Sequence, residues 1–417
     1  MRTSLLQACA YVAALALASS SLAARSQSVS VGSTSAVSLA NTGLPTYTVG
    51  GVLTADFPDG HLPVLWDGSK STSQIIWAEN QSWGSFGSNV PSAQNAYTTM
   101  GALPVSGVWG SGPTASGDRS EPTYFDNSGS WLMSAFRVDK GTFNLDPSSN
   151  YLIGFYHGED HWFTDAGTTN SYYHDPIAWM GIGLVTSSDG GDTWTKYGMV
   201  LGVPDLKPDY PSPFSPSNPN APWGGIGNHC TVLDSHSNPG QPVWVTFFPM
   251  IAANGLTAGH GITAAQTTDP NAARANWYAY YNGSFGTQQQ FNEGMNSPLP
   301  GLDGNAGSDY DHYSLGNPSV HWNTELNSWV LVAGTWDGSK ILISYSTSAN
   351  IAAGWTEPVL LYSVPAGTTV KYPTIVGTDH LGNLNDTESG ASATLYWAQF
   401  NSSGVRSMQS APLTFQK

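Results

Sequence analysis

The sequence predicts an all-β protein, and within that class a five-bladed β-propeller of four-stranded antiparallel blades. The chain of 417 residues contains 46 Gly, 27 Pro and 16 Trp but only 10% charged residues. This composition suits short strands and tight turns and disfavours long helices. A short strand, a turn and a second β-rich strand recur five times along the chain. The shortest spacing between copies, about 55 residues, accommodates one four-stranded sheet with its turns.

The first 24 residues are typical of a secretory signal peptide. Arg2 supplies the positive charge at the start, and the run from Leu5 to Ala18 is mostly apolar. That run is too short to span a bilayer comfortably, and small residues suited to signal peptidase follow it at Ala23 and Ala24. We therefore expect a secreted, extracellular protein that has no membrane segment once the signal is removed.

The mature chain is expected to form one domain. Residues 25–45, rich in Ser, Thr and Val, are expected to be a loose lead-in, and residues 46–417 to form the propeller. Four N-glycosylation sequons are consistent with a secreted glycoprotein. They begin at Asn80, Asn282, Asn385 and Asn401.

Charge and cysteine content narrow the function further. The formal net charge of −16 excludes the basic surface that a nucleic-acid-binding protein needs. An acidic protein surface is, however, compatible with binding a neutral polyhydroxylated ligand. Beyond the signal only Cys230 remains, so no intramolecular disulfide can form. Its apolar surroundings in the sequence predict a buried, inert thiol.

The five repeats are recognised by their opening residues. Proline is tolerated there because the start of a strand needs no ladder N–H. The openings are Leu62-Pro63, Glu121-Pro122, His229-Cys230, Asn317-Pro318 and Tyr372-Pro373. The fourth unit shows four complete strand segments. The second unit shows five, so either it has an extra strand or its innermost strand is not residues 121–126.

The stretch from Ser187 to Trp194 reads SSDGGDTW. It resembles the Asp-box of sialidases and related propellers, a hairpin turn in which Asp189 caps backbone amides, glycine takes a positive φ and Trp194 packs beneath. In those proteins the motif is structural and lies away from the active site. We therefore expect Asp189 and Trp194 to stabilise a turn and to take no part in chemistry.

The five-fold repeat is similar to that of the five-bladed glycosidases, namely the arabinanase/β-xylosidase and invertase groups. Arg119-Ser120-Glu121-Pro122 resembles the Arg-Asp-Pro of the invertase group. The resemblance implies catalytic carboxylates at the openings of the first strands. This chain departs from that pattern at Leu62 and at His229, which stand where two of the carboxylates are expected.

In a propeller, the first strands converge on one mouth of the central channel, and the second strands return to it. Glu121 and His229 are therefore predicted as catalytic residues. The other residues delivered to the mouth are expected to bind substrate; they are His61, Arg119, Asp311, His312, Asn317 and Tyr372.

The stretch YHGEDHWF, residues 156–163, concentrates ionisable groups in a chain with few charges. Because the apolar run YLIGFY leads into it, these groups are expected at a strand end at the same mouth. Glu159 and Asp160 are predicted as catalytic, and His157 and His161 as substrate-binding, since clustered carboxylates and imidazoles shift each other's pKa values toward acid–base work. The alternative is a turn whose histidines satisfy nearby backbone.

Three functions remain open from the sequence, all directed at an oligo- or polysaccharide. The first is a glycoside hydrolase with paired carboxylates, Glu121 with Glu159 or Asp160, and Asp59 in reserve. The second is a polysaccharide lyase with His229 or Tyr372 as base and Arg119 as the countercharge. The third is a lectin that binds glycans in the same pit. No cofactor is expected, although the resemblance allows a calcium ion on the axis.

Overall fold

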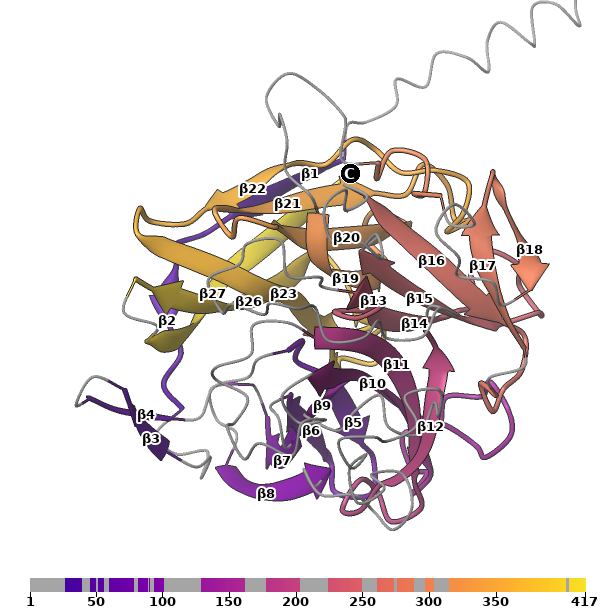
Figure 1. Ribbon diagram of the computed structural model, residues 1–417, viewed down its shortest axis with the longest axis horizontal. Helices are drawn as coiled ribbons and strands as arrows, with labels where there is room; N and C mark the ends of the chain where they lie inside the picture. The colour runs from indigo at the N-terminus through magenta and orange to yellow at the C-terminus, as the bar shows by residue number, and fades with distance from the viewer. Residues whose placement is uncertain are drawn as a thin grey trace, which may run out of the picture.

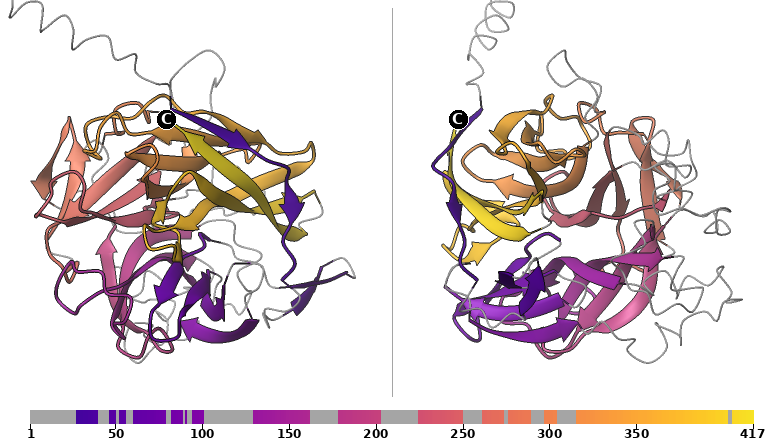
Figure 2. Two further views of the ribbon diagram at one scale, coloured as in Figure 1. Left: turned by 180° about the vertical axis from the view of Figure 1, so that it is seen from behind. Right: turned by 60° about the vertical axis from the view of Figure 1, so that its left-hand side comes forward.

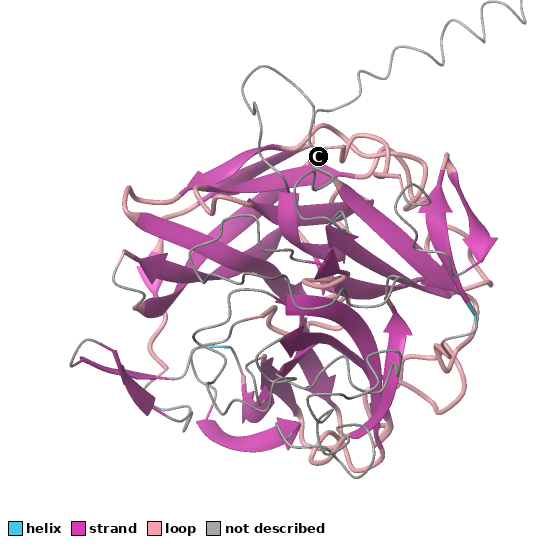
Figure 3. Cartoon of the chain, in the orientation of Figure 1, coloured by secondary structure: helices cyan, strands magenta, loops and turns pink. Residues whose placement is uncertain are grey.

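The computed structural model is all-β, and its sheets form a five-bladed propeller around a central axis, as predicted (Figures 1 and 3). It describes residues 27–39, 46–49, 52–55, 60–78, 82–88, 90, 94–100, 129–161, 178–202, 224–249, 261–273, 276–288, 297–303, 315–402 and 405–417. No helix in these ranges is long and apolar enough to cross a bilayer. The predicted signal peptide lies outside them.

The first two blades are antiparallel sheets whose strands follow chain order. Blade 1 consists of β5 (Val64–Asp67), β6 (Thr72–Trp77), β7 (Ser82–Gly87) and β8 (Gln94–Met100). Blade 2 consists of β9 (Gly129–Arg137), β10 (Leu152–His161), β11 (Ala178–Ser187) and β12 (Thr195–Leu201), and the short β13 (Gly224–Gly225) pairs with β11. The first of the four laddered strands in blade 2 is therefore β9. Residues 121–126, the other candidate, lie outside the described residues.

The remaining blades include one with an unexpected fifth strand. Blade 3 consists of β14 (Cys230–Asp234), β15 (Val243–Pro249), β16 (Ile262–Thr267), β17 (Trp277–Tyr281) and β18 (Ser284–Gln288). Blade 4 consists of β19 (Leu315–Asn323), β20 (Ser328–Thr335), β21 (Lys340–Tyr345) and β22 (Val359–Ser363). Blade 5 contains β23 (Thr368–Thr378), β26 (Ser392–Asn401) and β27 (Arg406–Gln416). A separate hairpin is formed by β3 (Thr46–Val49) and β4 (Val52–Ala55).

The N-terminal segment closes the ring. β1 (Ser28–Val31) pairs antiparallel with β27 from Ser28 opposite Gln416 to Val31 opposite Leu413, and β2 (Ser35–Ala36) pairs further along the same strand. Figure 2 shows this indigo strand lying along the yellow last blade. The expectation of a loose lead-in is wrong for these residues. The alternation of Ser and Val in SVSV places Val29 and Val31 against the core of blade 5, which is the ordinary signature of a half-buried strand.

The innermost strands meet around the axis. β5 contacts β9, β9 contacts β14, β14 contacts β19, β19 contacts β23, and β24 (Leu384–Asn385) returns to β5. Three backbone N–H groups here donate to a side chain of the neighbouring blade. These bonds join Thr231 N to Ser134 Oγ at 2.9 Å, Val320 N to Cys230 Sγ at 3.4 Å, and Leu62 N to Thr374 Oγ1 at 3.3 Å. Cys230 is therefore the buried thiol that was expected, and burial raises its pKa to about 12.

The segment from β24 to β25 (Glu388–Ser389) contacts the blades on either side of blade 5. Asp386 accepts a hydrogen bond from Val64 N of blade 1 at 3.2 Å, and the Thr387 carbonyl accepts one from Trp322 N of blade 4 at 2.9 Å. β25 also pairs parallel with β19. The segment thus bonds to two blades other than its own.

The same segment contains a sequon that the fold disfavours for glycosylation. Asn385 is buried, and its amide oxygen accepts hydrogen bonds from Thr387 N, Thr387 Oγ1 and Glu388 N. A glycan could not be attached without breaking this turn. Asn282 and Asn401, by contrast, are exposed.

The turn from Ser187 to Trp194 joins β11 to β12. Asp189 accepts hydrogen bonds from Ser187 Oγ, Thr193 N and Thr193 Oγ1, and Gly190 and Gly191 have φ values of 80° and 99°. Trp194 is buried in the core between blades 1 and 2, as expected. The turn is structural.

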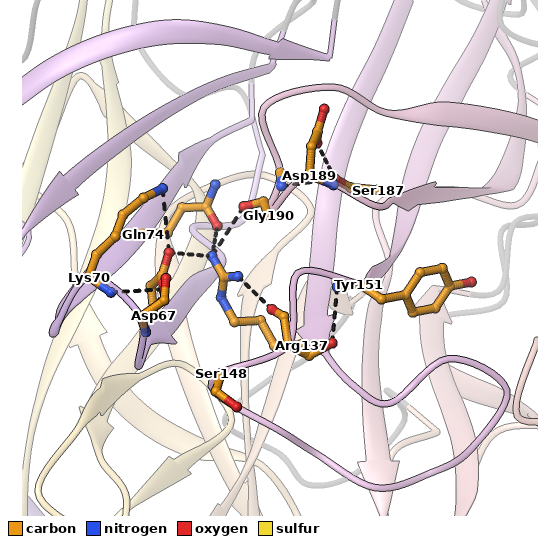
Figure 4. A network of polar contacts seen from close by, with 12 residues as sticks. Asp67, Lys70, Gln74, Arg137, Ser148, Tyr151, Ser187, Asp189 and Gly190 are labelled. Atoms are coloured by element: carbon orange, nitrogen blue, oxygen red, sulfur yellow. Dashed lines mark hydrogen bonds and ion pairs between the residues drawn. The ribbon is translucent and has the colours of Figure 1, made fainter.

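A buried ion pair ties blades 1 and 2 together near this turn (Figure 4). Arg137 of β9 contacts Asp67 of β5 at 3.0 Å, and its guanidinium also donates to Gln74 Oε1 and to the carbonyls of Ser149 and Gly190. Burial opposes ionisation of Asp67, but Ser69 and the charges of Arg137 and Lys70 outweigh it and lower its pKa. The carboxylate therefore stays charged inside the protein.

We expect Arg137→Met to lower the free energy of unfolding by about 3–5 kcal/mol, because it leaves the buried Asp67 carboxylate without its main counter-ion. The double variant Asp67→Asn/Arg137→Met should recover part of the loss. Urea unfolding of both variants measures this, and equal destabilisation in the two would contradict the ion-pair explanation.

Asp386 is partly exposed at its surface, but the protein around its carboxyl group raises its pKa to about 7 by desolvation, against the lowering effect of the Val64 N–H bond. The folded state therefore favours the protonated acid. The stability that this gives is present at pH 4 and is lost as the pH rises toward 7.

We expect Asp386→Asn to raise the free energy of unfolding at pH 8 by a few kcal/mol, at about 1.4 kcal/mol for each pKa unit, and to change it little at pH 4. Denaturant titrations of both proteins at the two pH values test this. A difference that is the same at pH 4 and pH 8 would show that Asp386 is not held as an acid.

Candidate active site

The candidate site lies at the face where the first strands begin and the second strands end. β10 ends there at His161, and its whole length to that residue pairs with β11, so the charged stretch is a strand end and not a turn. Residues 228 and 229 enter the same region immediately before β14, and Tyr372 lies at an irregular position in β23. The hydrogen bonds below show that these elements meet.

A chain of hydrogen bonds links three blades at this face. Tyr372 Oη of blade 5 donates to Asn228 Oδ1 at 3.3 Å, and Asn228 N donates to His157 Nδ1 of blade 2 at 3.2 Å. His157 Nε2 then lies 2.9 Å from Glu159 Oε1. His157 and Glu159 lie on one side of β10 because strand residues two apart share a face.

This chain of bonds fixes the tautomer of His157. Nδ1 accepts a backbone N–H and therefore carries no proton, so the ring proton lies on Nε2 and is donated to Glu159. Glu159 Oε1 accepts this bond, and 16% of its side chain is exposed. The arrangement holds a carboxyl group in a defined position, as a general base or a nucleophile requires.

The position of His157 requires glycine at residue 227. A Cβ on Gly227 would lie 2.2 Å from His157 Cε1 and 2.3 Å from its Nδ1. The next residue, Asn228, has a φ of 51°, a left-handed conformation that asparagine tolerates better than most residues. The strained turn thus aims a backbone N–H at the imidazole. Trp131 of β9 packs on the other side, with ring centroids 5.3 Å apart.

Two more histidines fill the axis beneath this network. His61 Nδ1 is 3.2 Å from Thr374 Oγ1, its ring packs edge-on against Tyr372 at 5.8 Å, and the Pro373 and Pro318 carbonyls face it. His229 is fully buried. Both imidazoles are therefore shielded from solvent by the surrounding protein.

Both rings are kept neutral by their surroundings. Burial lowers the pKa of His61 to about 3, although the two proline carbonyls oppose the change. Burial, and then the neighbouring His157 and His61, lower the pKa of His229 well below its ordinary value. His321, buried between blades 4 and 5, likewise has its pKa lowered by burial to about 3.

We expect stability to fall as the pH drops from about 6.5 toward 3, because the unfolded chain binds protons on these histidines and the folded chain does not. Above pH 6.5 they contribute no pH dependence. Replacing His321 with Phe, which resembles it in shape, should flatten the slope by about 1.4 kcal/mol per pH unit. Unfolding titrations between pH 4 and 7 test this, and an unchanged slope in His321→Phe would contradict it.

The structure brings together five of the predicted site residues: Glu159, His157, His229, His61 and Tyr372. Asn317 lies at a bulge near the start of β19 with a φ of 51°. For Asp160 and His161 only the backbone is described, paired opposite Trp179 and Ala178. Five predicted residues lie outside the described ranges; these are the reserve carboxylate Asp59 and Arg119, Glu121, Asp311 and His312.

The structure also modifies two assignments. His229, predicted as catalytic, has no exposed surface. Tyr372 donates to Asn228 and so positions the network. Trp131 was missed because its segment, SWLMSAF, reads as an ordinary core strand. Among the described residues no group of three or more His, Cys, Asp or Glu could hold a metal ion.

Several solved structures are similar to this chain at low sequence identity. No family model and no curated protein matches this chain. The α-L-arabinofuranosidase from Lactobacillus brevis is 8% identical, with a TM-score of 0.45, over 84% of this chain and 89% of that chain. A GH43_1 enzyme from Xanthomonas citri is 11% identical, with a TM-score of 0.46, over 91% of each chain. The endo-arabinanase from Bacillus licheniformis is 12% identical, with a TM-score of 0.43, over 85% of this chain and 94% of that chain.

Proposed function

We propose that this protein is a secreted glycoside hydrolase that acts on an oligo- or polysaccharide at the mouth of the propeller. The observation that carries the proposal is the Tyr372–Asn228–His157–Glu159 chain of hydrogen bonds. A structural role alone does not explain a carboxylate held by a histidine of fixed tautomer at a partly open strand end. It is the arrangement expected for a group that must accept a proton or attack a carbon.

In this proposal Glu159 acts as the base or the nucleophile. If it is a base, it takes a proton from water while the water oxygen bonds to the anomeric carbon, and a separate acid protonates the departing glycosidic oxygen. If it is a nucleophile, it bonds to the anomeric carbon as the glycosidic bond breaks and the acid protonates the departing oxygen. The residue that acted as the acid then takes a proton from water, whose oxygen bonds to the anomeric carbon and releases the Glu159 carboxylate. Glu121, predicted from the sequence, is our candidate for the acid.

The described residues support a lyase mechanism less well than a hydrolase mechanism. It would require His229 or Tyr372 to remove a proton from a uronate. His229 is fully buried, and the Tyr372 hydroxyl is engaged with Asn228. A lectin would bind a glycan at the same place without cleaving it, and an activity measurement distinguishes a lectin from a hydrolase.

We expect Glu159→Gln to reduce turnover by two to four orders of magnitude, because it keeps the shape and removes the proton acceptor. The measurement is the release of reducing ends from a panel of polysaccharides that includes arabinan, arabinoxylan, galactan and a polyuronate. Glu325→Gln, an exposed substitution in the turn between β19 and β20, is the matched control.

Three outcomes decide the proposal. Loss of activity in Glu159→Gln, with thermal stability and Glu325→Gln unaffected, supports it. Unchanged activity in Glu159→Gln overturns the assignment of Glu159. Glycan binding without turnover in the wild type overturns the hydrolase in favour of a lectin, and unsaturated products overturn it in favour of a lyase.

A further inference from the structure

Trp336 is exposed at the same face as the candidate active site. It lies in the turn between β20 and β21, directly after Thr335, which pairs with Leu315 at the start of β19. The side chain is 53% exposed. Trp329 and Trp397, by contrast, are among the large side chains that are fully buried in the core, as expected for a propeller.

The turn that carries Trp336 is held firmly. Asp337 Oδ1 accepts hydrogen bonds from Thr335 Oγ1 at 2.6 Å and from the N and Oγ of Ser339. Gly338, with a φ of 70°, donates to the Thr335 carbonyl and accepts from Val370 N of blade 5, both at 2.8 Å. The exposed indole is therefore attached to a turn that hydrogen bonds hold to both blade 4 and blade 5.

The indole projects inward over the first strand of its blade. A Cβ on Gly316 would lie 3.3 Å from Trp336 Cε3 and 3.8 Å from its Cζ3, so the ring covers a residue that has no side chain. Gly316 lies in β19, between the turn and the axis. The next residue is Asn317, whose buried Oδ1 has no hydrogen-bond partner among the described residues.

We propose that Trp336 is a sugar-binding platform that holds a residue of the glycan across the mouth from Glu159. One face of a sugar ring presents mainly C–H groups, and these pack against a flat aromatic surface while the hydroxyls remain in water. A rigid, exposed indole loses little conformational entropy when such a ring covers it. The inference rests on the proposed function for the identity of the ligand as a carbohydrate.

The position of the platform implies a ligand of several sugars. Trp336 belongs to blade 4 and Glu159 to blade 2, and blade 3 stands between them in the ring. A sugar stacked on Trp336 is therefore a different unit from the one cleaved at Glu159. Loss of the indole should weaken the binding of long chains and leave short substrates unaffected.

The experiment compares Trp336→Ala, Trp336→Phe and wild type. With a polysaccharide that the wild type cleaves, Trp336→Ala should raise KM about tenfold with little change in kcat, and Trp336→Phe should restore most of the affinity. With an aryl monosaccharide substrate both variants should match the wild type. Tyr197→Ala, which removes a 62% exposed aromatic ring from β12, is the matched control.

Binding to the Glu159→Gln protein separates this inference from the hydrolase proposal. Affinity electrophoresis through gels containing the polysaccharide should show retardation that Trp336→Ala abolishes and Tyr197→Ala does not. If the wild type binds through Trp336 but cleaves nothing, the hydrolase proposal fails and the platform stands. If Trp336→Ala cleaves and binds as the wild type does, the platform is wrong. Self-association that Trp336→Ala abolishes, with glycan binding intact, would also overturn it.

Discussion

The geometry of this propeller depends on how five first strands meet at one axis. They approach each other without forming a continuous ladder, so backbone N–H groups at the axis need acceptors from elsewhere. Ser134, Cys230 and Thr374 provide them, each accepting from the N–H of the following blade. A buried N–H without a partner would cost about 1–3 kcal/mol. Small acceptor side chains at these positions therefore fix how neighbouring blades are aligned along the propeller axis.

That constraint also creates the site. Above the axial bonds the first strands leave regular geometry, with Asn317 and Tyr372 at irregular points of β19 and β23 and Asn228 just before β14, all in left-handed conformations. Such residues are costly and persist where surrounding contacts hold them. Here they direct the Tyr372 hydroxyl toward Asn228 Oδ1 and the Asn228 backbone N–H toward His157 Nδ1. The positioned carboxylate of Glu159 is a consequence of contacts between blades 2, 3 and 5.

The buried ionisable groups oppose each other in their effect on stability. The neutral histidines His61 and His229 favour the folded state less as the pH falls, whereas Asp386 favours it less as the pH rises. The protein is therefore expected to be most stable in mildly acidic to neutral solution.

The sequence determined the class of fold, the five-fold repeat, the four strands of blade 4 and the structural turn at Asp189, because these follow from local periodicity and turn chemistry. It also placed His157 and Glu159 at a strand end, since YLIGFY precedes them. It could not identify β1 as the closing strand, because the partner of SVSV is nearly 400 residues away. Nor could it separate the fully buried His229 from Glu159, whose side chain is partly exposed. Strand openings predict convergence on the axis, but the burial of each side chain is set by contacts between blades. The tautomer of His157, the covering of Gly316 by Trp336 and the contacts of residues 384–389 with blades 1 and 4 were decided by tertiary structure alone. Each of them joins segments that only the folded chain brings together.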